Sequence, residues 1–249
     1  MRSGAGSCAA VVGSASKKVT VRQQVSSASM VAVNWWLYVW AIQSGHVYAA
    51  SLGYYILPLL MMLLGLLVLG ERLTRRQWAA VLLAGLGVGI LAAGALTTMW
   101  LSVSMAVTFG LYGLLRKTVA AGPLAGLTVE SLILYPAALG IVAWYWSTPE
   151  GPAIGRGWEL ALAVAWSGPM TAVPLMWFAT AARRLPYTVM GFLQFSSPTI
   201  VFLLGLFVFG EELRPAQLAC FALIWAAAAL FTWELVRGRK PAAASAAAS

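Results

Sequence analysis

The amino-acid sequence predicts an all-α integral membrane protein that crosses the bilayer about eight times. Of its 249 residues, 61% are hydrophobic and 9% are charged, and the mean hydropathy is +0.84. An ordinary soluble domain carries about 25% charged residues, so this chain has too few polar side chains to cover a water-soluble surface. The apolar residues form runs close to the length that a membrane-spanning helix needs, about 20 residues.

Eight apolar runs are expected to span the membrane, and short loops join them. They cover residues 30–43, 47–69, 77–97, 99–115, 127–146, 158–180, 187–209 and 216–236. The first run is short for a membrane helix and contains Asn34. Residues 1–28 form a polar tail without the apolar core of a secretory signal. Residues 239–249 form an Ala-rich tail that we expect to be disordered and cytoplasmic.

The basic residues fix the expected orientation. If the N-terminus is cytoplasmic, the cytoplasmic segments hold 14 of the 16 Lys and Arg residues, and the outside loops hold only Arg156 and Arg214. Cytoplasmic loops of membrane proteins carry an excess of basic residues, so both termini are predicted to be cytoplasmic. The same clustering explains the net charge of +9 without a nucleic-acid partner.

The residues needed for most enzyme chemistry are missing from the sequence. All seven acidic residues are Glu, the one histidine is His46, and the two cysteines are Cys8 and Cys220. A Ser-His-Asp triad, a His-rich zinc site and a Gly-rich phosphate loop therefore cannot be assembled. We expect no catalytic residue, no metal and no cofactor, and hence no enzyme.

A repeat is visible when the chain is shifted by 140 residues. Residues 58–83 and 198–223 then align without a gap, and 12 of the 26 positions are identical, including Pro58/Pro198, Glu71/Glu211 and Gln77/Gln217. The repeated segments belong to the second and seventh spans. These spans are five apart in the chain, and an odd separation means that they cross the membrane in opposite directions. Inverted repeats of this kind are typical of secondary transporters. A duplication that was kept only for packing is the alternative.

Two of the repeated residues are prolines inside spans. Pro58 and Pro198 cannot donate to the carbonyls of Tyr54 and Gln194, four residues earlier. A carbonyl left free at membrane depth must find another donor, which a neighbour, water or a ligand can supply. We therefore expect two broken helices whose polar residues Tyr54 and Gln194 share a cavity near the midplane. Kinks that packing alone relieves are the alternative, and Pro136 is a third predicted kink.

Several strings resemble one family. They are NWWLYVWAIQSG (34–45), AASLGYYILPL (49–59), GLYGLLRK (110–117), VESLILYP (129–136), TAVPLMWFATAARRL (171–185), GFLQFSSPT (191–199) and FALIWAAAALF (221–231). In this order they resemble RarD-type permeases, of the EamA branch of the drug/metabolite transporter superfamily. The resemblance implies ten helices in two inverted five-helix repeats, in the bacterial cytoplasmic membrane, with both termini inside.

The resemblance also implies a departure at the N-terminus. It starts near residue 31, so the first two family helices are missing and residues 1–28 stand outside the family. Residues 29–120 then hold the remainder of the first repeat (spans 1–3) and the first helix of the second repeat. Residues 121–238 hold the rest of the second repeat. The predicted fold is thus the remnant of a ten-helix, five-plus-five inverted repeat.

Candidate site residues follow from polarity inside the spans. Glu130 is the acidic residue set deepest in a span, and the resemblance matches Glu there; it either binds a cationic group or a proton, or is an interfacial carboxylate. Asn34 and Tyr38 share a helix face and are predicted to line the cavity. Tyr54, Tyr55, Trp177 and Gln194 complete the predicted substrate-binding set. Glu71 and Glu211 follow glycines at helix ends and are predicted to be structural, and Gly85 and Gly89 predict a close helix contact.

The predicted function is a secondary transporter, a permease or exporter that moves a small organic metabolite or drug by alternating access. The alternative is a truncated membrane protein that does not transport, or a packing subunit. The expected partners are a small-molecule substrate and the lipid bilayer, and a homodimer is left open.

Overall fold

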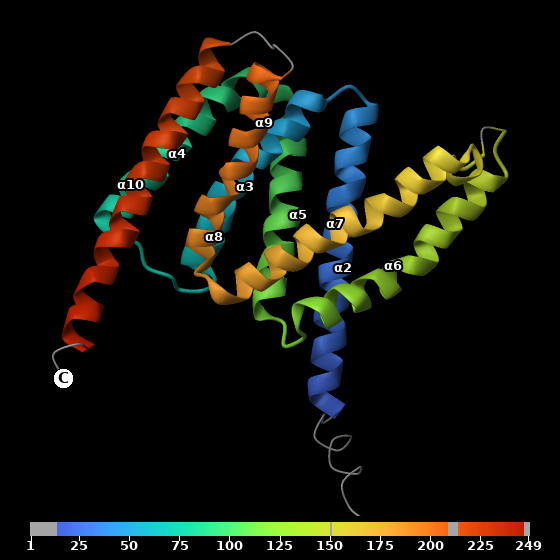
Figure 1. Ribbon diagram of the computed structural model, residues 1–249, viewed down its shortest axis with the longest axis horizontal. Coiled ribbons are helices and arrows are strands. Elements are labelled where there is room, and N and C mark those ends of the chain that lie inside the picture. Colours follow the sequence, from blue (N-terminus) through green and yellow to red (C-terminus); the bar gives the residue numbers. More distant parts are fainter. Residues whose placement is uncertain (1–13, 150, 209–213, 247–249) are drawn as a thin grey trace, which may run out of the picture. The chain divides into compact units, whose positions relative to one another are not determined.

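The computed structural model describes residues 14–149, 151–208 and 214–246, and the part it describes consists of helices and loops (Figure 1). The helices are α2 (Ser14–Gln43), α3 (Val47–Leu67), α4 (Arg75–Ala92), η1 (Ala93–Thr98), α5 (Met99–Thr118), α6 (Pro123–Trp146), η2 (Ala153–Gly155), α7 (Trp158–Arg184), α8 (Tyr187–Gln194), α9 (Ser196–Phe207) and α10 (Pro215–Ala246). The prediction of an all-α membrane protein with many spans is therefore confirmed.

Seven helical segments among the described residues are long and apolar enough to cross a membrane. The eighth expected span, residues 77–97, forms α4, whose 18 residues begin with Arg75 and Arg76 and which is not among these seven. The first expected span is longer than predicted. Helix α2 starts at Ser14, and its apolar part covers Val21–Gln43, so the short span of residues 30–43 is corrected.

The C-terminal helix is also longer than the sequence suggested. Helix α10 continues to Ala246, through most of the 239–249 tail for which disorder was predicted. Alanine has the highest helix propensity of all residues, which explains why an Ala-rich extension continues a helix. The N-terminal Cys8 and the repeat positions Gly210 and Glu211 lie outside the described residues.

The chain forms two compact units, which cut across the order of the sequence. Unit 1 comprises residues up to Val33 together with Leu111–Arg184, and unit 2 comprises Asn34–Gly110 together with the residues from Leu185 onward. Unit 1 therefore contains α6 and α7 with parts of α2 and α5. Unit 2 contains α3, α4, η1, α8, α9 and α10 with the remaining parts of α2 and α5.

The 140-residue repeat reappears in the helix boundaries of unit 2. Helix α3 begins at Val47 and α8 begins at Tyr187, while α4 begins at Arg75 and α10 begins at Pro215. Both pairs of starts are 140 residues apart, and so are the ends of α3 and α9, at Leu67 and Phe207. The second copy of α3 is divided, because α8 and α9 are separate helices on either side of Phe195.

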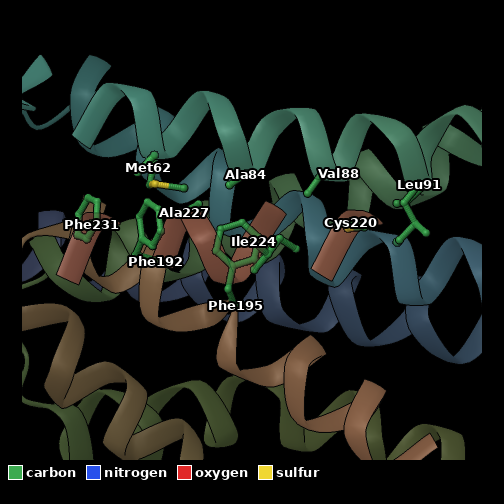
Figure 2. Close-up of a cluster of buried hydrophobic side chains, with 12 residues drawn as sticks. Met62, Ala84, Val88, Leu91, Phe192, Phe195, Cys220, Ile224, Ala227 and Phe231 are labelled. Carbon is green, nitrogen blue, oxygen red and sulfur yellow. The ribbon is translucent and has the colours of Figure 1, made fainter. Parts of the chain in front are cut away.

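The repeated helices pack against each other and form the core of unit 2. Helix α4 packs along α10 and α3 packs along α8. Equivalent positions of the two copies belong to one buried cluster, for example Leu52 and Phe192. Ala84 and Ile224 are another such pair (Figure 2). The rings of Phe192 and Phe231 stack with centroids 3.9 Å apart. The core therefore follows the 140-residue repeat.

The close helix contact predicted at Gly85 and Gly89 occurs at Gly87 instead. A Cβ atom at Gly85 or Gly89 would have no neighbour within 4 Å, whereas one at Gly87 would lie 3.0 Å from the carbonyl oxygen of Cys220 on α10. The G-x-x-x-G spacing was therefore the wrong signal. Gly87 shares a helix face with the buried residues Ala80 and Ala84, and this small-residue face lets α4 approach α10.

The repeated glutamine begins a helix in both copies. In the first copy, Thr74 and Gln77 form a capping box at the start of α4, with each side chain accepting from the other residue's backbone N–H. In the second copy, the Gln217 side chain accepts from the backbone N–H of Arg214, at 3.3 Å. Gln77 and Gln217 are therefore in register because each satisfies a backbone N–H before the first turn of its helix.

Candidate functional site

A cavity of about 590 Å³ lies within unit 2. It is lined by residues of α2, α3, α4, α9 and α10, namely Tyr38, Ile42, Val47, Tyr48, Ala50, Ser51, Leu52, Tyr54, Tyr55, Leu91, Ser197, Pro198, Val201, Phe202, Leu206 and Gln217. Ile42 and Val47 flank the α2–α3 loop, while Leu206 and Gln217 lie near the end of α9 and the start of α10. The cavity therefore occupies the end of unit 2 that holds the α2–α3 loop.

The described lining is polar in places but carries no charge. Four tyrosines, two serines and Gln217 supply hydroxyl and amide groups, and the other lining residues are apolar. The Tyr48 hydroxyl donates to the carbonyl oxygen of Leu91 at 2.9 Å, and the rings of Tyr38 and Tyr54 meet edge to face with centroids 6.2 Å apart. A cavity of this size with a few polar groups among apolar walls is typical of a small-molecule site.

The break between α8 and α9 lies beside this cavity. Pro198 lines the cavity and has no backbone N–H, so the carbonyl of Gln194 loses its normal helical donor. Helix α8 ends at Gln194 and α9 starts at Ser196. The predicted broken helix is therefore found in the second copy. In the first copy, α3 runs without interruption through Pro58, so the prediction of two broken helices is corrected to one.

Four of the predicted residues line the cavity, whereas Asn34 and Gln194, which also belong to unit 2, do not. Tyr38, Tyr54, Tyr55 and Pro198 are lining residues. Asn34 uses its amide for packing instead, because Nδ2 donates to the Met105 carbonyl at 2.8 Å and to Thr108 Oγ1 at 3.0 Å. Gln194 is half-buried at the end of α8 and is not a lining residue.

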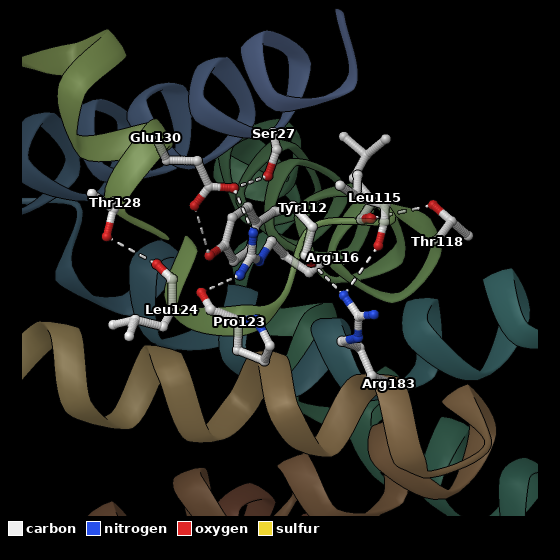
Figure 3. A network of polar contacts seen from close by, with 12 residues as sticks. Ser27, Tyr112, Leu115, Arg116, Thr118, Pro123, Leu124, Thr128, Glu130 and Arg183 are labelled. Carbon is white, nitrogen blue, oxygen red and sulfur yellow. Dashed lines mark hydrogen bonds and ion pairs between the residues drawn. The ribbon is translucent and has the colours of Figure 1, made fainter. Parts of the chain in front are cut away.

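Glu130 lies in unit 1, in a buried polar network (Figure 3). Its carboxylate accepts from the Ser27 hydroxyl, lies 3.4 Å from the Arg116 guanidinium and 3.4 Å from the Tyr112 hydroxyl. Arg116 also donates to the carbonyl of Pro123 at 2.8 Å. The Glu130 and Arg116 side chains are only 2% and 1% exposed. Glu130 therefore belongs to a buried ion pair and is not an interfacial carboxylate.

The same network explains why α6 has a glycine at position 126. A Cβ atom at Gly126 would overlap the guanidinium of Arg116, so only glycine leaves room for the arginine at this point. Ser27, Arg116 and Glu130 come from α2, α5 and α6, respectively. The ion pair and its hydrogen bonds therefore join three helices inside unit 1.

The remaining predicted residues of unit 1 lie on its surface. Trp177 on α7 is 68% exposed, and Pro136 lies on an exposed part of α6. Hydropathy cannot separate such positions from cavity positions, because both are apolar or aromatic in a membrane protein.

The cavity includes polar residues that sequence reasoning missed: Tyr48, Ser51, Ser197 and Gln217. Ser51 and Tyr55 are four residues apart on α3, as are Ser197 and Val201 on α9, so each pair shares one helix face. The face that carries Tyr54 and Tyr55 could have been extended one turn back to Ser51. Gln217 had a signal in the repeat, which alone did not show that it reaches a cavity.

At the opposite end of unit 2, Glu71 contacts the start of α8. Its two carboxylate oxygens accept from the backbone N–H groups of Tyr187 at 2.6 Å and Thr188 at 2.8 Å, at the start of α8. Glu71 therefore caps the start of α8 rather than the end of the helix that precedes it.

The comparisons with known proteins agree with this architecture. A model of the EamA-like transporter family matches residues 10–93. This match starts inside the 1–28 tail that was predicted to stand outside the family. One crystal structure has the same fold, with a TM-score of 0.63 and 22% sequence identity, over 84% of this chain and 76% of the other.

Three bacterial relatives identify the branch. An uncharacterized transporter of Pseudomonas aeruginosa is 44% identical, over 85% of this chain and 71% of its own length. The RarD protein of Streptomyces exfoliatus is 41% identical, over 85% of this chain and 67% of its own. A chloramphenicol-sensitive protein RarD of P. aeruginosa is 34% identical, over 85% and 70%. The chain therefore belongs to the EamA family of bacterial membrane transporters and, within it, to the RarD type.

Proposed function

We propose that the chain is a secondary transporter that moves a small organic solute by alternating access, and that the cavity of unit 2 is its solute site. The single observation that carries this proposal is the cavity itself, because it lies within the inverted repeat, beside a helix broken at Pro198. Transporters with inverted repeats bind their substrates at such broken helices.

The cavity is open toward the outside in this conformation. With both termini in the cytoplasm, α2 and α9 run outward and α3 runs inward, so the α2–α3 loop is an outside loop. The lining residues lie at that end of unit 2, while Glu71 and the start of α8 lie at the cytoplasmic end. A site open to one face and shut at the other is one state of an alternating-access cycle.

The lining favours an uncharged solute that has both apolar and hydrogen-bonding parts. Among the described lining residues a compact ion would lose its hydration without meeting a fixed charge, and this costs several kcal/mol or more. Tyrosine rings and hydroxyls, by contrast, offer apolar area and a polar group on the same side chain. Glu130, which is buried against Arg116, takes the role of joining three helices of unit 1 rather than binding cargo.

The name of one relative supplies a practical probe, chloramphenicol. The test compares two tryptophan substitutions on α9, at the lining residue Val201 and at its neighbour Ile200, which does not line the cavity. These residues are similarly exposed, at 65% and 57%. Val201→Trp fills the cavity and should abolish the effect of the chain on the accumulation of labelled chloramphenicol by cells, while Ile200→Trp should preserve it.

The protein level in the membrane is the control for both variants. The proposal is wrong in its choice of site if both substitutions act alike at equal protein levels. It is wrong in its choice of solute if the unmodified chain leaves accumulation unchanged.

A further inference from the structure

We propose that Glu71 is a positioning residue for transport, whose carboxylate locks the start of α8 and so holds the cytoplasmic end of unit 2 shut while the cavity is open to the outside. This inference rests on the proposed function, since it assigns a gate to the same cavity. It uses contacts within unit 2 alone.

The carboxylate of Glu71 contacts the start of α8. The first backbone N–H groups of any helix have no partner inside the helix. The residue before α8, Pro186, makes no side-chain cap. Glu71 satisfies two of these groups from another part of the chain, with one oxygen on Tyr187 and the other on Thr188. A carboxylate at the positive end of a helix dipole makes strong, charge-assisted hydrogen bonds.

The surrounding backbone leaves room for this carboxylate at Gly65 and Gly70. Gly70 has a φ of +65°, which turns the chain after α3 and directs the next residue toward α8. A Cβ atom at Gly65 would lie 2.8 Å from Glu71 Oε2 and 3.0 Å from Thr188 Cγ2. The end of α3, the Glu71 carboxylate and the start of α8 are therefore in close contact, with no room for a solute between them.

Helix α8 is short and is separated from α9. This helix has only eight residues, and the break at Phe195 separates it from α9, which carries the lining residues Ser197 and Val201. It can therefore change its tilt about the break without rebuilding the wall of the cavity. The contact with Glu71 holds the end of α8 that lies farthest from this break, together with the hydrogen bond that the Tyr187 hydroxyl donates to the Gly110 carbonyl at 2.6 Å. Removing the carboxylate charge therefore loosens the attachment of α8 at the cytoplasmic end.

The test measures from which side a cysteine in the cavity can be reached. Ser197→Cys is introduced after Cys8 and Cys220 are replaced by alanine, and the membrane-impermeant reagent trimethylammonium-ethyl methanethiosulfonate is added to right-side-out and inside-out vesicles. The parent chain should react only from the outside. With Glu71→Gln, which removes the charge and one acceptor, the reaction from the cytoplasmic side should rise by roughly tenfold or more.

The matched control is Glu234→Gln. Glu234 is another carboxylate of unit 2, and its partner is Arg76 rather than α8. This variant should react like the parent. A second readout is hydrogen exchange at the amides of Tyr187 and Thr188, which should become faster in Glu71→Gln only. If Glu71→Gln does not reach the membrane, Glu71→Asp serves, because its shorter side chain withdraws the carboxylate from α8.

The outcomes separate the gate from the site. If the parent reacts from outside and Glu71→Gln behaves like Glu234→Gln, the gate is refuted and the proposed site stands. If the parent reacts from neither side, or only from the cytoplasm, the proposed outward-open site is refuted, and the gate with it.

Discussion

The two compact units bury polar groups in opposite ways. Unit 1 contains a charged pair, Glu130 and Arg116, which is almost fully buried and surrounded by hydrogen bonds. Unit 2 contains a cavity of about 590 Å³ whose described lining has hydroxyls and an amide but no charge. Unit 1 therefore buries a charge together with its counter-charge, whereas the described lining of the cavity in unit 2 is polar but uncharged.

This difference follows from the cost of removing charge from water. A buried ion pair offsets its lost hydration only through close contact and further hydrogen bonds. Here these bonds connect α2, α5 and α6, although Arg116 Nε is buried without a partner. A solute site must be empty part of the time, and an unpaired charge there would be costly in the empty state. This difference supports the proposals that Glu130 joins helices and that the tyrosine-lined cavity is the solute site.

The largest expected effect comes from breaking the buried ion pair. Glu130→Ala leaves Arg116 buried without its carboxylate, so the free energy of unfolding should fall by about 3–5 kcal/mol. The control is the ion pair between Arg76 and Glu234, which has nearly the same separation, 3.3 Å against 3.4 Å, but side chains that are 57% and 19% exposed. Glu234→Ala should cost about 1 kcal/mol or less.

Denaturant or thermal unfolding in detergent measures both variants. Equal losses of stability in the two would show that burial does not distinguish the pairs. If the Glu130→Ala protein is stable but fails to transport, Glu130 acts in transport rather than in holding the helices together.

A smaller effect is expected from the glycine beside Arg116. Gly126→Ala places a methyl group where the guanidinium lies, so the network must shift, at a cost of about 1–3 kcal/mol. Gly140 on the same helix is the matched control, because a Cβ atom there would have no neighbour within 4 Å. Gly140→Ala should be neutral or slightly stabilising, since alanine favours a helix. Unfolding measurements that rank the two variants in the reverse order would contradict the tightly packed network.

Much of the fold could be predicted from the sequence, because the membrane imposes simple rules. Apolar runs showed the helices: the spans expected to start at residues 47 and 187 do so, whereas those expected to start at 77 and 216 begin at Arg75 and Pro215. Helix ends were harder to predict. Polar tail residues before residue 28 continue α2, and alanines continue α10, because backbone hydrogen bonding extends a helix beyond its apolar part.

The site was predicted only in part, because polarity in a span does not show what a side chain contacts. Asn34 and Tyr38 lie one turn apart on α2, yet Asn34 bonds to Met105 and Thr108 while Tyr38 lines the cavity. The two copies of the repeat also differ at one pair of positions. Tyr54 and Gln194 are repeat mates, but only Tyr54 lines the cavity, since the helix breaks after Gln194 and not after Tyr54.

That last pair provides the most direct test of the account, which holds that the cavity of unit 2 is the solute site. The measurement is the rate at which an impermeant thiol reagent, added from outside, modifies Tyr54→Cys and Gln194→Cys with and without chloramphenicol. The account predicts that Tyr54→Cys reacts and that the solute slows this reaction, while Gln194→Cys shows no protection. Protection of Gln194→Cys, or an unprotected Tyr54→Cys in a chain that transports the solute, would contradict it.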